Sequence, residues 1–118
     1  MIESPKAVTL KSNVDFRRIY ARGHSYANPA LVTYVRKNCA GICRIGITSS
    51  KKIGNAVERN KSRRLIRAAF REVYKTYGDQ LQGYDFIFIA RVKTRYRKST
   101  DLVPVMVQHL KKAGLITG

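Results

Sequence analysis

The stretch that decides how this chain folds is KKIGNAVERNKSRRLIRAAFRE, residues 51–72. It contains eight Lys or Arg and two Glu, which gives it a local charge of +6. A run of charge is usually a solvated surface or a disordered tail. Here apolar residues recur through the run at intervals of three and four, the spacing of an amphipathic α-helix. The stretch therefore predicts a basic helix that packs against a core.

The predicted helix has two distinct faces. At about 100° per residue, one face groups the side chains expected to face the core: Ser62, Ile66, Ala69, Phe70, Val73 and Tyr77. A second face groups Asn60, Arg64, Arg67 and Arg71. No glutamate interrupts this second face. That favours a phosphate-binding surface over an ordinary solvated one, because guanidinium groups bind phosphate through paired hydrogen bonds.

The composition indicates a polyanionic partner. The chain has 118 residues, which predicts a single domain, 1–118, and its net charge is +17. A hydrophobic fraction of 44% is too high for a disordered chain. Nucleic acid, an anionic membrane or an acidic protein could neutralise the charge. No apolar run is long enough to span a bilayer and the N-terminus lacks a signal-peptide core, so we expect no membrane partner and a cytoplasmic location.

Before the basic helix, the pattern predicts one helix and three strands. Residues 1–8 are expected to form an extended lead-in. Ser12 or Asn13 can cap a helix that ends at Arg22, because a glycine follows. Strands are predicted at residues 25–27, 31–36 and 44–49. We expect the last two of these strands to pair with each other as a hairpin.

The basic helix should begin after Asn55 and end at Gly78. Residues 85–91 are a nearly continuous apolar run, typical of a strand buried on both faces. A strand, a long helix and a buried strand in succession predict a parallel βαβ unit. A basic loop at 92–98 leads to a final helix, in which Pro104 is tolerated only in the first turn. The order αβββαβα predicts an α+β fold with helices packed on one sheet.

The residues favour binding over catalysis. The acidic residues are spread singly, and no Ser/His/Asp or Cys/His arrangement is visible. Cys39 and Cys43 flank a predicted turn without two further zinc ligands at a matching spacing, so we interpret them as free thiols, with a disulfide as the alternative. We predict no catalytic residue, no metal site and no bound cofactor.

Three aromatic residues are candidates for contacts with RNA bases. Phe16 and Tyr20 are four residues apart on the predicted first helix, and Tyr34 lies in a predicted strand. Unpaired bases stack on such rings when proteins bind single-stranded RNA. Ordinary core packing explains the same residues equally well, so both interpretations stay open at this point.

The basic stretch also carries a family motif. Residues 51–67, KKIGNAVERNKSRRLIR, closely resemble the signature S-K-K-x-G-x-A-V-x-R-N-x-x-K/R-R-x-x-R of the bacterial ribonuclease P protein subunit. The flanks agree in order and distance, since 10–23, 89–91 and 109–115 resemble the first helix, the last strand and the C-terminal helix of that family. The resemblance extends over about residues 9–116.

This resemblance implies a four-stranded mixed sheet with three helices, in a fold class shared with a domain of a ribosomal protein. It also implies a left-handed βαβ crossover, whereas the general rule predicts a right-handed one. Members of the family are accessory subunits of an endoribonuclease that removes the 5′ leader from precursor tRNA. The active site and its Mg²⁺ belong to a catalytic RNA. The implied partners are therefore this RNA and precursor tRNA, and not DNA.

The resemblance assigns residues to two RNA surfaces. With Arg71 added from the helical periodicity, those expected to bind the catalytic RNA are Lys51, Lys52, Arg59, Asn60, Arg63, Arg64, Arg67 and Arg71. Those expected to hold the leader in a central cleft are Phe16, Arg17, Tyr20 and Tyr34. The chain departs from the family at Ser62, where a hydrophobic residue is common, and at 48–50, where Val-Ser is commoner. A ribosomal-type RNA-binding protein without a role in cleavage and a protein-only nuclease stay as alternatives.

Overall fold

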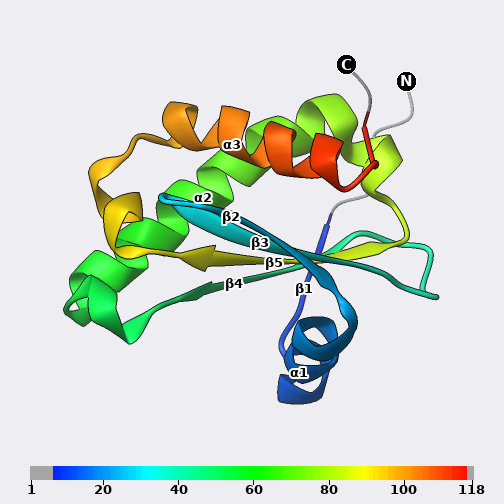
Figure 1. The fold of residues 1–118 in the computed structure, drawn as a ribbon, viewed down its shortest axis with the longest axis horizontal. Helices are drawn as coiled ribbons and strands as arrows, with labels where there is room; N and C mark the ends of the chain where they lie inside the picture. The colour runs from blue at the N-terminus through cyan, green and yellow to red at the C-terminus, as the bar shows by residue number, and fades with distance from the viewer. Residues whose placement is uncertain (1–6, 117–118) are drawn as a thin grey trace.

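A mixed β-sheet with helices on both faces forms the framework of the protein (Figure 1). The computed structural model describes residues 7–116, apart from the Lys51 side chain. The strands are β1 Val8–Thr9, β2 His24–Asn28, β3 Leu31–Lys37, β4 Arg44–Ser49 and β5 Tyr84–Ala90. The α-helices are α1 Asn13–Arg22, α2 Ala56–Tyr77 and α3 Ser99–Lys112. Short 3-10 turns are η1 Lys51–Ile53, η2 Gly78–Leu81 and η3 Val92–Tyr96. The α+β class and the three helices are therefore confirmed.

The sheet order is β1-β4-β5-β3-β2, so the predicted hairpin between the strands at 31–36 and 44–49 was wrong. Instead, β5 lies between β3 and β4, antiparallel to the first and parallel to the second. The physical reason lies in the apolar run of β5, whose Phe86, Ile87 and Phe88 are all buried. A strand that is apolar on both faces is best placed in the middle of a sheet, where both of its edges are also paired.

The predicted parallel βαβ unit is confirmed, because β4, α2 and β5 follow one another and the two strands pair in parallel. The left-handed sense of this crossover stays a prediction. The sheet has five strands where the resemblance implied four, because Val8 and Thr9 pair in parallel with Arg44 and Ile45. This short strand ends the expected lead-in, whose residues 1–6 lie outside the described part of the chain.

The helices begin largely where their capping residues predict. The Ser12 hydroxyl accepts a hydrogen bond from the amide of Val14, and the Asn55 side chain accepts one from Glu58, which starts α2. The expectation for Pro104 was wrong, since α3 begins at Ser99 and places this proline in its second turn. Proline removes one hydrogen bond from a helix, but here the buried side chains on either side of it hold α3 against the core.

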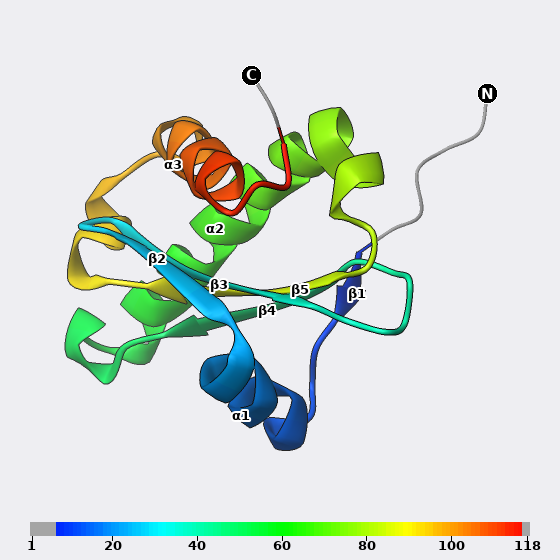
Figure 2. The same ribbon diagram turned by 45° about the vertical axis from the view of Figure 1, so that its right-hand side comes forward.

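Two hydrophobic layers separate the helices from the sheet. The larger layer lies between the sheet and the pair α2 and α3, and includes Phe70, Phe88 and Met106. The smaller lies under α1 and is built on Leu10, Ile19 and Ile87. Figures 1 and 2 show α2 and α3 together on one face of the sheet and α1 on the other.

The predicted core face of α2 is confirmed. Ser62, Ile66, Ala69, Phe70 and Val73 are buried, while Tyr77 is partly buried and packs against the same cluster. Ser62, which departs from the family pattern described above, leaves no unsatisfied polar group in this core face. Its hydroxyl donates to the Glu58 carbonyl one turn earlier, at 3.0 Å.

A buried histidine in α3 makes the stability of the fold depend on pH. His109 is 1% exposed, and its Nδ1 lies 2.8 Å from the Thr33 hydroxyl on β3. Burial, and then the charge of Lys112, lowers the pKa of His109 from 6.5. The unfolded state therefore takes up a proton before the folded state does, and His109 should cost stability as the pH falls below about 6.5.

We expect a smaller loss of stability on acidification in His109→Gln than in the natural chain. Chemical denaturation at about pH 7.5 and about pH 5.5 measures this difference, because the carboxylates contribute equally in both proteins. Equal losses in the two proteins would contradict a neutral, buried His109.

Candidate nucleic-acid interface

One side of α2 presents a continuous basic surface. We define the α2 surface as the residues of this helix predicted to contact RNA: Arg59, Asn60, Arg63, Arg64, Arg67 and Arg71. Asn60, Arg64, Arg67 and Arg71 are exposed, and the other two are partly exposed. With Val57, four of these residues line a shallow hollow of about 540 Å³. The structure thus brings the predicted row together on the side of α2 that faces solvent.

The charges of the α2 surface are available to a ligand. Within residues 7–116, no carboxylate pairs with Arg64, Arg67 or Arg71. Asn60 has a different role from the arginines beside it, because its side-chain oxygen accepts a hydrogen bond from the Arg63 guanidinium. The asparagine therefore orients Arg63 within the α2 surface. Guanidinium groups that have no partner in the protein are suited to bidentate contacts with phosphate.

Hydrogen bonds from Arg95, a residue that the sequence did not identify, hold the N-terminal end of α2 in place. Arg95 of η3 donates to the carbonyl of Ile53 and to the carboxylate of Glu58. Gly54 has φ +133°, and a Cβ atom there would lie 2.7 Å from the Glu58 carboxylate. The positive φ requires glycine at this turn, and a side chain there would also displace the Glu58 carboxylate. Lys52 is exposed here, while the side chain of Lys51 lies outside the described part of the chain.

The second predicted site is a groove beside α1. We define the aromatic groove as a hollow of about 650 Å³ that is lined by Asn13, Phe16, Arg17, Tyr20, Ile47 and Thr48. Tyr34 adjoins this groove. The centre of the Tyr34 ring lies 5.0 Å from the centre of the Tyr20 ring, in an edge-on arrangement. The ring centres of Phe16 and Tyr20 are 6.4 Å apart. All four predicted leader-binding residues therefore lie in one place.

The rings of the groove both pack and remain accessible. Phe16 and Tyr34 are partly buried against the small core under α1, whereas Tyr20 is 39% exposed. Burial, and then the neighbouring Tyr34, raises the pKa of Tyr20, so its hydroxyl stays protonated and can donate a hydrogen bond. The two interpretations of these aromatics are therefore not exclusive, since each ring has a packed side and an open side.

A glycine in β4 shapes the floor of the groove. A Cβ atom at Gly46 would lie 2.5 Å from the ring of Phe16, so only glycine lets that ring rest on the sheet. Asn13, Ile47 and Thr48 also line the groove, although no sequence pattern identified them. The only indication was the departure from the family pattern at 48–50, which by itself suggested no contact with Asn13.

The described residues show few groups for other chemistry. Within residues 7–116, no three His, Cys, Asp or Glu side chains lie together as a metal site. Cys39 is exposed and Cys43 is buried, and both are free thiols. Burial and the nearby Asp85 raise the pKa of Cys43 to about 12, which keeps it protonated and unreactive. In the same part of the chain, no helix is both long and apolar enough to cross a membrane.

Known proteins resemble this chain over nearly its whole length. The family model for ribonuclease P matches residues 4–114. A ribonuclease P protein component from Clostridium botulinum (strain Loch Maree / Type A3) is 41% identical over 106 residues, covering 90% of this chain and 94% of the relative. The corresponding protein of Clostridioides difficile (strain 630) is 45% identical over 94 residues, covering 79% and 80%.

Solved structures resemble the fold as well as the sequence. The RNase P protein of Staphylococcus aureus is 39% identical, with a TM-score of 0.77, covering 95% of this chain and all of that chain. The RNase P protein from Thermotoga maritima is 30% identical, with a TM-score of 0.73, covering 93% and 98%.

Proposed function

Since the chain belongs to the ribonuclease P protein family, we propose that it binds the catalytic RNA through the α2 surface and the 5′ leader of precursor tRNA through the aromatic groove. Membership makes it a component of an endoribonuclease that processes tRNA. The two surfaces then bind different RNAs, and the cleavage step with its Mg²⁺ belongs to the RNA subunit.

The row of exposed arginines on α2 is the main support for binding of the catalytic RNA at the α2 surface. Arg64, Arg67 and Arg71 have no carboxylate partner within residues 7–116, and the helix presents them along one line. Phosphates of a folded RNA recur at short intervals, and each can accept a guanidinium fork. The +17 net charge makes the free protein repel itself, so an extended polyanion is the partner that relieves it best.

The aromatic groove supports the second assignment. It is open, it has rings at its wall and floor, and the exposed Arg17 supplies a cation at its edge. Single-stranded RNA is held by this combination, with bases stacking on aromatic rings while cations follow the backbone. A precursor tRNA has such a strand in its leader, and a mature tRNA does not.

Reconstitution tests the proposed function. The protein is mixed with a bacterial ribonuclease P RNA at low Mg²⁺, and release of the leader from labelled precursor tRNA is followed. We expect faster cleavage with the protein than with the RNA alone. RNA binding without faster cleavage would favour a ribosomal-type protein, and cleavage without any added ribonuclease P RNA would indicate a protein-only nuclease.

A tyrosine substitution tests the groove. Tyr20→Ala is expected to weaken binding of precursor tRNA to the reconstituted complex by about 10-fold, because a stacked base is worth about 1–3 kcal/mol. Binding of mature tRNA should be unchanged, and Tyr20→Phe should retain most of the affinity. Competition binding with the two tRNAs measures both effects. Equal losses for the two tRNAs would assign Tyr20 to the core instead.

A further inference from the structure

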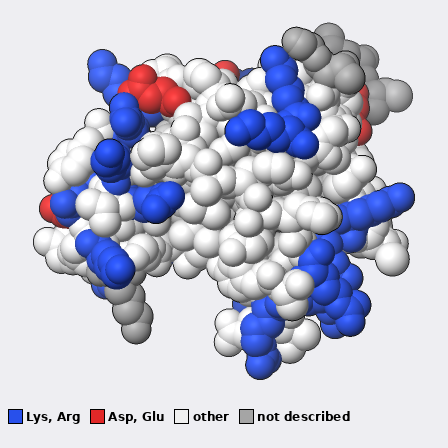
Figure 3. All heavy atoms as spheres, in the orientation of Figure 1, with Lys and Arg blue, Asp and Glu red and all other residues white. Residues whose placement is uncertain are grey.

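Residues 91–98, RVKTRYRK, form a second basic segment that neither RNA surface includes. It has five Lys or Arg and no acidic residue. Its exposed charged and aromatic members, which we define as the η3 surface, are Arg91, Lys93, Tyr96, Arg97 and Lys98. In Figure 3, Lys and Arg side chains follow one another down the left side of the molecule, over the region of η3 and the start of α2.

Two inward-facing residues hold this segment in place. Thr94 is fully buried, and its hydroxyl accepts from the Arg91 amide at 2.8 Å and donates to the Ala30 carbonyl. Arg95 bonds in turn to the entrance of α2, at Glu58. The segment therefore connects the β2–β3 turn to α2 as an ordered bridge. An ordered surface loses little conformational freedom on binding, so its contacts contribute more to affinity.

Tyr96 is the most unusual residue of the bridge. Its side chain is 72% exposed, and the guanidinium carbon of Arg95 lies 4.8 Å from its ring centre. The contact with Arg95 involves one face of the ring and leaves most of the side chain open to solvent. A ring backed by a guanidinium group is a ready platform for an unpaired base, with charge nearby for its phosphates.

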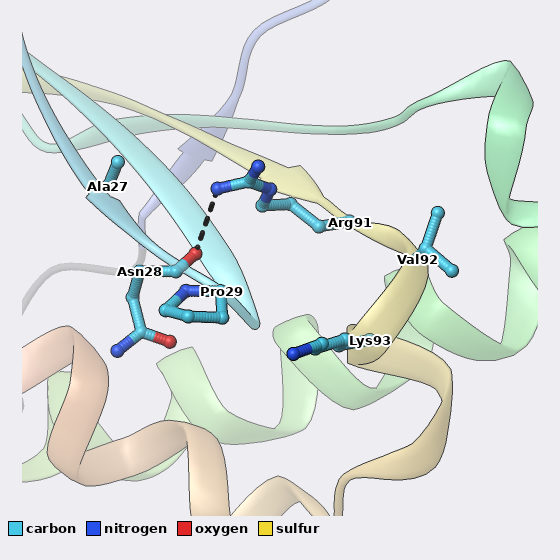
Figure 4. A pocket seen from close by; sticks show the side chains of 6 residues that line it. All are labelled: Ala27, Asn28, Pro29, Arg91, Val92 and Lys93. Atoms are coloured by element: carbon cyan, nitrogen blue, oxygen red, sulfur yellow. Dashed lines mark hydrogen bonds between the residues drawn. The ribbon is translucent and has the colours of Figure 1, made fainter.

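A hollow at the other end of η3 adds a cationic recess. It has a volume of about 400 Å³ and is lined by Ala27, Asn28, Pro29, Arg91, Val92 and Lys93. Figure 4 shows Lys93 extending from η3 toward Pro29, and Arg91 reaching the Asn28 carbonyl, to which it donates at 3.2 Å. Two cations therefore flank a recess in which a phosphate group fits.

We propose that the η3 surface is a third RNA contact, where an unpaired nucleotide of the catalytic RNA stacks on Tyr96 and the flanking cations bind its phosphates. The inference rests on the proposed function and deepens it. Position favours the catalytic RNA over the leader. The bond from Arg95 reaches Glu58, next to Arg59 of the α2 surface, whereas the aromatic groove lies on the α1 face of the sheet. An RNA strand leaving the α2 surface can continue onto η3.

The test measures equilibrium binding of the full chain to ribonuclease P RNA alone and to precursor tRNA alone, over a series of salt concentrations. Tyr96→Ala should weaken binding of ribonuclease P RNA by about 10-fold without changing the salt slope, and Tyr96→Phe should restore it. Lys93→Ala with Arg97→Ala should make the negative salt slope shallower by about 2, one for each lost phosphate contact. Lys111→Ala with Lys112→Ala removes equal charge from the end of α3 and serves as the control.

The outcomes separate this inference from the proposed function. If the η3 variants bind ribonuclease P RNA like the control while Arg64→Ala with Arg67→Ala loses affinity, the η3 contact is wrong and the proposed function stands. A loss confined to precursor tRNA would also overturn the assignment, because η3 would then bind substrate. If the natural chain itself fails to bind ribonuclease P RNA, the proposed function fails. Circular dichroism and thermal unfolding establish that each variant is folded.

Discussion

Replacing Arg64 and Arg67 together by alanine is expected to weaken binding of the catalytic RNA by about 10- to 100-fold. Both guanidinium groups are exposed on the α2 surface and have no carboxylate partner within residues 7–116. Binding releases one fewer counterion for each phosphate contact that is lost, so the negative slope of log affinity against log salt should become shallower by about 2. Filter binding or fluorescence titration across salt concentrations measures both quantities.

The fold should not change in this variant, because neither side chain contributes to the core and alanine favours helix. The charge-matched control is again Lys111→Ala with Lys112→Ala on α3, for which we expect a much smaller loss. If the two double variants lose affinity equally, binding depends on net charge alone. The α2 surface would then have no special role.

Replacing Arg44 by methionine is expected to lower the free energy of unfolding by about 3–5 kcal/mol. Asp85 is 1% exposed at the start of β5, and the Arg44 guanidinium holds it through two bonds of 2.7 and 2.8 Å. Asn38 donates a third bond at 2.7 Å. Without Arg44, the carboxylate would stay buried with its charge uncompensated, and this accounts for the large effect. Urea denaturation at neutral pH measures the change.

Arg36 provides the matched control, since it lies opposite Asp85 across the β3–β5 pair but forms no ion pair within residues 7–116. Arg36→Met should change stability by no more than about 0.5 kcal/mol. The double variant Arg44→Met, Asp85→Asn should recover part of the loss, because the uncompensated charge is gone. Similar losses for Arg36→Met and Arg44→Met would show that the ion pair contributes little.

The basic helix could be predicted in detail because its determinants are local. Its caps, Asn55 and Gly78, lie at its ends, and the burial of Ile66 and Phe70 follows from a repeat of three and four residues. The exposed row containing Arg64 and Arg67 follows from the same repeat. A motif carried on one helix keeps its spacing in the structure, so the residues of the α2 surface could be named from the sequence.

The pairing of the strands could not be predicted in the same way. Alternation indicated that 31–36 and 44–49 are strands, but a strand pattern does not say which neighbour it chooses. The two strands are neighbours in the sequence, so we expected them to pair with each other. In the structure β5 lies between them, because a strand that is apolar on both faces is best placed at the centre of the sheet. The two-residue β1 has too few residues to show any alternation.

The amino-acid sequence by itself determined the basic helix, the family and the row of exposed arginines on α2 that we propose binds phosphate, because these depend on spacing along one element. Tertiary structure decided what surrounds them. It placed Gly46 under Phe16 to form the floor of the aromatic groove, and turned Arg95 inward so that Tyr96 lies beside the entrance of α2. Such contacts join residues that are 30 to 42 positions apart. They arise when the sheet and helices pack, and no local pattern specifies them.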